Sequence, residues 1–172
     1  MRDAVDLSRL QVFLKELSLS AREPVRLYLT GGASQLVRGL RESTIDVDLT
    51  FEPESDDVLR SMVALKERLN LNVELVSPAH FVPALPGWRE RCQFIEQVGR
   101  LAVHHFDPYT QVLSKLERGH ARDLADAAAL VREGVVDPER LRVLFGQIQG
   151  ELFRYPAIDP KSLRTAVQDL GR

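Results

Sequence analysis

Two aspartates at alternate positions of a predicted strand are the residues of this chain best suited to bind a metal. Asp46 and Asp48 alternate with the apolar residues Val47 and Leu49, which is the period-2 pattern of a half-buried strand. Their side chains therefore share one face, with Cα atoms about 7 Å apart. Both carboxylates can reach one hard cation, and without a cation they would repel each other. The spacing favours a divalent-metal site.

A glycine pair precedes these aspartates. Gly31 and Gly32 follow a short apolar strand, and thirteen residues separate Gly32 from Asp46. Glycines at such a point allow a sharp turn or the close approach of a phosphate. On the functional reading, their amides and the start of the next helix face a phosphate group. Ser34 either adds its hydroxyl to such a site or caps the helix.

Three elements must position these residues: a strand, a helix and a second strand. The first strand has Leu27 and Leu29 on its buried face and Tyr28 and Thr30 on the other, as expected for a half-buried strand. The second strand begins at Thr44. Its predicted buried face consists of Ile45, Val47, Leu49 and Phe51. The helix between the strands carries apolar residues at helical spacing, at Ala33, Leu36, Val37 and Leu40.

The glycine pair, the thirteen-residue gap and the run Asp46-Val47-Asp48-Leu49 resemble the signature of the polymerase-beta-like nucleotidyltransferases. Arg41 and Thr44 complete an R-x-x-T-x-D-x-D run that is common in small bacterial members. The resemblance implies that the glycine turn cradles a nucleoside triphosphate such as ATP. It also implies that the acidic pair holds Mg²⁺ or Mn²⁺ for nucleotidyl transfer.

A later segment, residues 115–130, resembles the lysine and aspartate helices of AbiE-type abortive-infection toxin nucleotidyltransferases. By this resemblance Lys115 would neutralise triphosphate charge, and Arg118, one turn further on, could face the same anion. Asp123 occupies the position of the family's aspartate motif. Asp126 either shares that role or pairs with Arg122 on its own helix.

Glu74 is the candidate for the third carboxylate of the family, a metal ligand or a base toward the attacking hydroxyl. It lies on a predicted strand over residues 71–76, on the same face as Asn72. The alternative is a charge on an edge strand, exposed to water.

His104 and His105 are neighbours on another predicted strand and therefore point to opposite faces. They cannot readily bind one metal together. Packing in the core or at the surface is the better interpretation for both.

Composition describes a globular chain of 172 residues, with 44% hydrophobic and 28% charged residues. The net charge of −2 provides no global basic field, so contact with RNA would need a local patch. The single cysteine, Cys92, excludes an internal disulfide framework and suits a reducing cytoplasm. No apolar run predicts a membrane span, and we expect a cytoplasmic protein whose oligomeric state stays open.

The predicted fold is α+β: a nucleotidyltransferase-like mixed sheet of about five strands flanked by helices, followed by a helical part. The α/β half is expected over residues 1–106 and the helical half over 107–172, packed together as one unit. Residues 77–91 are expected to form an irregular connection because they contain several prolines. In the helical half, Asp107, Asp137 and Asp159 each precede a proline and predict helix starts.

These observations lead to a first functional hypothesis, a metal-dependent nucleotidyltransferase. Its acceptor would be an RNA 3′ end, for example of tRNA, or a hydroxyl on a partner protein. A toxin–antitoxin or phage-defence setting is implied by the resemblance alone. The alternative is a nucleotide- or protein-binding module without turnover, such as an antitoxin. Catalysis would be disfavoured if Glu74 lay away from the two aspartates.

Overall fold

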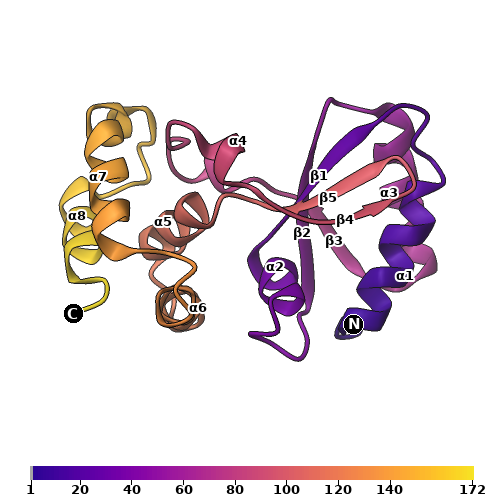
Figure 1. The fold of residues 1–172 in the computed structure, drawn as a ribbon, viewed down its shortest axis with the longest axis horizontal. Helices are drawn as coiled ribbons and strands as arrows, with labels where there is room; N and C mark the ends of the chain where they lie inside the picture. Colours follow the sequence, from indigo (N-terminus) through magenta and orange to yellow (C-terminus); the bar gives the residue numbers. More distant parts are fainter. Residues whose placement is uncertain (1) are drawn as a thin grey trace. The chain divides into compact units, whose positions relative to one another are not determined.

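The structure is a computed structural model of the chain and describes residues 2–172. The chain divides into two compact units (Figure 1). Unit 1 consists of Met1–Ser77 and Cys92–Phe106, and unit 2 of Pro78–Arg91 and Asp107–Arg172. The predicted boundary after residue 106 is thus also a boundary between units, while residues 78–91 belong to the helical unit. Packing of the two units as a single body stays a prediction.

Unit 1 is built on a five-stranded mixed sheet with the spatial order β3-β2-β1-β5-β4. β1 pairs antiparallel with β2 and parallel with β5; β2 and β3 are parallel, and β4 and β5 antiparallel. The strand bounds are β1 Val25–Thr30, β2 Asp46–Glu52, β3 Asn72–Leu75, β4 Gln93–Val98 and β5 Leu101–His105. The predicted α+β fold with a mixed sheet is confirmed.

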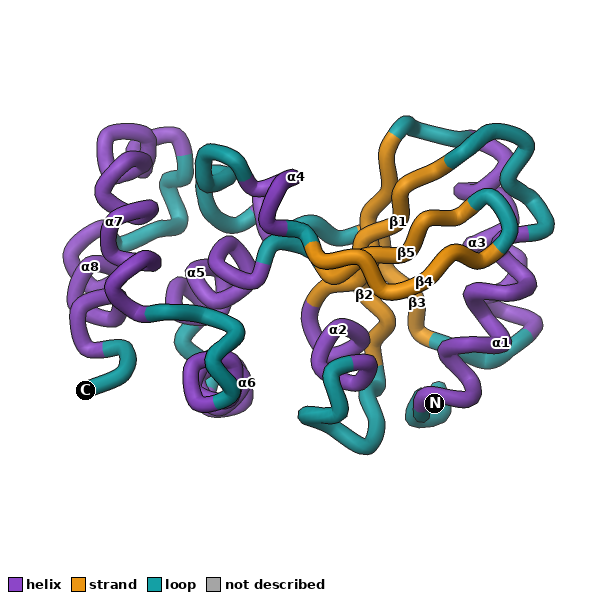
Figure 2. Tube along the Cα trace, in the orientation of Figure 1, coloured by secondary structure: helices purple, strands orange, loops and turns teal. Residues whose placement is uncertain are grey.

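Three helices accompany this sheet: α1 Leu7–Ser18, α2 Gly31–Val37 and α3 Asp56–Arg68. Figure 2 shows α1 and α3 next to each other beside the strands, and the two helices are in contact. The side chains of Asp6 and Ser55 cap α1 and α3 by accepting from the backbone N–H groups of Arg9 and Val58. The apolar stripes of both helices join the inward side chains of the strands in one core.

Two details of the strands differ from the sequence prediction. Ile45 is 46% exposed, because β2 begins only at Asp46 and Thr44 instead forms an isolated antiparallel bridge with Val5. Tyr28 is fully buried although it lies opposite the apolar core face of β1. Its ring packs against His104 and Phe106, with centroids 5.7 and 5.8 Å away. β1 is the central strand of the sheet, and apart from the exposed Arg26 it is buried on both faces.

Unit 2 is helical, with α5 Pro108–Arg118, α6 Ala121–Arg132, α7 Pro138–Ile148 and α8 Pro160–Asp169. Asp107, Asp137 and Asp159 cap α5, α7 and α8 through their side chains, as predicted. The expected irregular segment contains short helical turns, η1 Pro78–His80 and α4 Trp88–Arg91, and η2 Gln149–Arg154 follows α7.

No helix within residues 2–172 combines the length and the apolar character that crossing a membrane requires.

Candidate functional site

Asp46 and Asp48 lie on one face of β2, as their spacing predicts. The buried residues Val47 and Leu49 alternate with them and join the core. Asp46 is exposed and Asp48 half-buried, so both carboxylates lie on the sheet face opposite that core. In the strand register Asp48 has Thr30 of β1 on one side and Glu74 of β3 on the other. The predicted third carboxylate is therefore a direct neighbour of the second.

The glycine pair brings the backbone against the acidic strand. Gly31 has a φ of +55°, and a Cβ at this position would lie 2.7 Å from Oδ2 of Asp48. A Cβ at Gly32 would lie 2.1 Å from Oγ1 of Thr44. Any other residue would have to displace one of these side chains. The two glycines are thus required by a close approach to Asp48 of β2 and to Thr44 just before that strand, and not by the turn alone.

Asn72 links two of the acidic residues. Its Nδ2 donates to Oδ1 of Asp46 at 2.6 Å and contacts Oε1 of Glu74 at 3.3 Å. It is the register partner of Asp46 on β3. The amide holds both carboxylates in place and offsets their mutual repulsion. Alternation along the strand predicted that Asn72 shares the face of Glu74, but it predicted no role for Asn72, because the parallel pairing of β2 and β3 is a tertiary feature.

The acidic residues fit a divalent cation that also binds a phosphate. Within residues 2–172, no three His, Cys, Asp or Glu side chains are grouped closely enough to hold a metal by themselves. Mg²⁺, however, commonly binds to one or two carboxylates together with water and substrate phosphates. Asp46 and Asp48 provide this pair of oxygen donors beside the glycine turn. Glu74 as a further ligand or base stays a prediction.

Ser34 faces the sheet. It is 2% exposed, and its Oγ lies 2.9 Å from Nδ1 of His105 on β5. Burial, with a smaller repulsion from Arg38, lowers the pKa of His105 to about 3, so its imidazole is neutral at pH 7. His104 lies on the other face, against the rings of Tyr28 and Phe94. The opposite orientation of the histidines is confirmed, but the contact with Ser34 was not predicted.

Two further polar residues, Gln35 and Arg38, follow Ser34 along the chain. Gln35 is 1% exposed, and neither atom of its amide has a hydrogen-bond partner. Arg38 donates from Nη2 to Oε1 of Gln93 at 2.6 Å, while its Nε is buried without an acceptor. Gln93 and His105 are register partners on β4 and β5. We call Ser34, Gln35, Arg38, Gln93 and His105 the polar seam of unit 1.

The predicted nucleotide-binding residues of unit 2 form an ion network. Lys115 is 6% exposed, and its Nζ lies 2.7 Å from Oδ2 of Asp126 and 3.5 Å from Oδ1 of Asp123. Arg118 donates to both carboxylate oxygens of Asp123. Asp126 thus pairs with Lys115 of α5 and not, as one alternative had it, with Arg122 of its own helix. Side chains from two helices meet here, which helical spacing alone does not reveal.

The predicted site residues therefore occur in both units. Those of the glycine turn and the acidic strand meet in unit 1, while Ser34 turns away from them toward His105. Lys115, Arg118 and Asp123 meet in unit 2, where two carboxylates already balance the lysine charge. A role of these three residues at the triphosphate stays a prediction.

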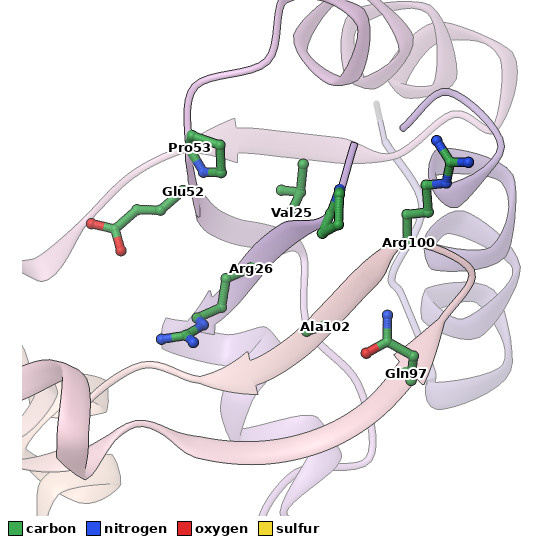
Figure 3. A pocket seen from close by; sticks show the side chains of 8 residues that line it. Val25, Arg26, Glu52, Pro53, Gln97, Arg100 and Ala102 are labelled. Carbon is green, nitrogen blue, oxygen red and sulfur yellow. The ribbon is translucent and has the colours of Figure 1, made fainter. Parts of the chain in front are cut away.

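Unit 1 also contains a hollow of about 410 Å³ at the other end of β1 (Figure 3). Arg26, Glu52, Gln97 and Arg100 provide its polar lining. Arg26 and Glu52 are register partners, as are Thr30 and Asp48. Because Arg26 and Thr30 are four residues apart on a strand, the hollow lies about 14 Å from the acidic pair. It is separate from the site described above.

The chain is a member of a nucleotidyltransferase family. Residues 6–162 match the model of a family described as "Nucleotidyltransferase of unknown function (DUF6036)". The match includes the glycine turn, the acidic strand and the ion network of unit 2. Comparison with the curated proteins and with the solved structures gave no match.

Proposed function

We propose that this protein is a metal-dependent nucleotidyltransferase that moves a nucleoside monophosphate from a nucleoside triphosphate, such as ATP, to an acceptor hydroxyl. The observation that carries the proposal is the approach of the glycine turn to the acidic strand, where a Cβ at Gly31 would touch Asp48. Phosphates bound at the turn would lie next to the carboxylates. The family membership supports the reaction class.

Asp46 and Asp48 would hold Mg²⁺ or Mn²⁺, which when bound would offset the negative charge of the phosphates. The backbone amides of Gly31 and Gly32 would donate to phosphate oxygens. Glu74 would accept the proton of the attacking hydroxyl. The acceptor oxygen would then form a bond with the α-phosphorus, and the bond from that phosphorus to the pyrophosphate oxygen would break. Asn72 would keep Glu74 and Asp46 oriented for these roles.

The identity of the acceptor is part of the proposal. An RNA 3′ end, including that of tRNA, and a Ser, Thr or Tyr hydroxyl on a partner protein both provide the required nucleophile. The likeness of residues 115–130 to AbiE-type toxins supports a toxin–antitoxin or phage-defence setting. With a net charge of −2, an RNA acceptor would depend on a local basic surface.

Isothermal titration of ATP, CTP, GTP and UTP, with and without Mg²⁺, tests the proposal. Wild type should bind at least one triphosphate only with Mg²⁺, and Asp46→Asn/Asp48→Asn should abolish that binding. The control Asp56→Asn/Asp57→Asn removes two exposed or half-buried charges from α3 of the same unit and should bind normally. Failure of folded wild type to bind any triphosphate would contradict the proposal. Binding without transfer to any RNA or protein acceptor would favour the alternative, a binding module.

A further inference from the structure

Arg38 is a half-buried cation whose side-chain partner is neutral. Its Nε is buried, and burial lowers the pKa of its guanidinium. Within residues 2–172, the one hydrogen bond of its guanidinium is to the neutral amide oxygen of Gln93. In the described part of the chain, residues 2–172, no carboxylate forms an ion pair with it. Removing a charge from water is costly unless a partner compensates it. An anion bound to this guanidinium would offset that cost.

Gln35 adds a second unsatisfied donor to the same region. It precedes Arg38 by three residues, and residues three apart are neighbours on a helix surface. Its buried amide has no partner on either atom, and buried polar groups without partners are rare in folded proteins. Gln35 also follows Gly31 by four residues on the same helix, α2. The helix that begins at the glycine pair therefore also carries part of the seam.

The other members keep the seam neutral apart from Arg38. A protonated His105 would repel an adjacent guanidinium, but burial keeps its imidazole uncharged above pH 3. Its contact with Ser34 anchors α2 to β5 and so fixes the helix that carries Gln35 and ends at its C-cap residue, Arg38. Gln93 is exposed, so one side of the guanidinium is bounded by a side chain that solvent can reach. A small anion could approach from that side.

We propose that the polar seam is a second phosphate-binding site, which takes one phosphate group through Arg38 and Gln35. Phosphate oxygens accept charge-assisted hydrogen bonds from guanidinium groups and can satisfy an amide N–H at the same time. The ligand is either the triphosphate of the nucleotide or a backbone phosphate of a nucleic-acid acceptor. This choice of ligand rests on the proposed function, whereas the anion site itself rests on the seam.

Nitrogen-15 NMR can observe the seam directly. Inorganic triphosphate and a short oligouridylate with no terminal phosphate serve as metal-free probes, titrated separately against the full chain. The signals of the Arg38 Nε–H and the Gln35 side-chain amide should shift saturably with at least one probe. Arg38→Met should weaken that binding by about 10- to 100-fold, the range for loss of a charge-assisted hydrogen bond. Arg38→Lys, which keeps the charge, should lose less.

The matched control is Arg60→Met, which removes a charge from an exposed arginine of α3 in the same unit. It should leave the binding of both probes unchanged. A response to inorganic triphosphate alone identifies the nucleotide as the source of the phosphate, and a response to the oligouridylate alone identifies the acceptor. Equal losses in Arg38→Met and Arg60→Met, or no shift at Arg38 and Gln35 with either probe, would overturn the proposal.

Asp46→Asn/Asp48→Asn separates this inference from the proposed function. The variant should lose Mg²⁺-dependent nucleotide binding but keep the metal-free response of the seam. Loss of the seam response in a folded Asp46→Asn/Asp48→Asn protein would show that the seam is not an independent site.

Discussion

Arg38 of unit 1 and Lys115 of unit 2 are both largely buried cations, but their surroundings differ. Lys115 contacts two carboxylates, those of Asp126 and Asp123. Arg38 contacts a neutral glutamine, and its Nε has no acceptor. The charge of Lys115 is thus balanced within the chain. No carboxylate of residues 2–172 balances the charge of Arg38.

From this difference we expect Lys115 to contribute to stability and Arg38 to contribute to ligand binding. Breaking a buried ion pair leaves an uncompensated charge and costs stability. Removing a cation that lacks an anionic partner costs little and can even stabilise the protein. Family resemblance singles out Lys115 and not Arg38, whereas the charge environment suggests that ligand binding depends more on Arg38. Four measurements can test this contrast.

The largest expected effect is on activity, through the acidic pair. Asp46→Asn/Asp48→Asn should lower nucleotidyl transfer by about 10³-fold or more, because the metal ligands would be lost. Its free energy of unfolding should stay the same or rise, since two neighbouring negative charges are removed. Transfer assays and urea denaturation measure the two quantities. A stability loss as large as that expected for Lys115 would instead give the acidic pair a structural role.

Lys115→Met should destabilise the protein by about 3–5 kcal/mol, because Asp126 and Asp123 would be left buried with less compensation. Urea or thermal denaturation measures the loss. In Lys115→Met/Asp126→Leu, part of that stability should return, as the buried network is replaced by apolar groups. If Lys115→Met unfolded like wild type but bound triphosphate poorly, the lysine would be a ligand residue and the contrast with Arg38 would fail.

His105 should make stability depend on pH. The unfolded chain protonates this histidine near pH 6.5, whereas the folded protein does so only near pH 3. Because the unfolded state binds more protons between these values, stability should fall as pH decreases from 6.5 toward 3. The contribution is up to about 1.4 kcal/mol per pH unit.

Urea denaturation at several pH values between 4 and 7 measures this dependence. His105→Asn cannot titrate in this range and should have a shallower profile than wild type. In Arg38→Met, the repulsion from the guanidinium is gone, so the pKa of His105 should rise but remain below 6.5 because burial is the larger cause. Identical profiles for wild type and His105→Asn would show that His105 is protonated in the folded protein as readily as in water.

The smallest expected effect is that of Arg38→Met on stability. The change removes a partly desolvated charge and one hydrogen bond to an exposed glutamine, and the two contributions oppose each other. The free energy of unfolding should change by less than about 1 kcal/mol in either direction. Denaturation of Arg38→Met and Lys115→Met under the same conditions compares the two variants directly. A loss of similar size in both would show that the two cations do not differ in what they contribute to stability.

Much of the site could be read from local patterns. Alternation put Asp46 and Asp48 on one face of a strand, and the spacing of Gly31 and Gly32 put a turn before the following helix. Caps at Asp107, Asp137 and Asp159 were recognisable because an aspartate followed by proline starts a helix through local bonds alone. Ile45 was misplaced, since the edge of a strand depends on its partner, and Thr44 pairs with Val5.

The sequence alone therefore determined the order of elements, the acidic strand and the glycine turn, because each depends on interactions between residues close along the chain. The tertiary structure decided which charges are compensated. Lys115 meets Asp126 because α5 and α6 pack together, and Arg38 meets Gln93 because β4 returns beside β5. Pairings of this kind join residues far apart in sequence, and hydrophobic or helical periodicity carries no information about them.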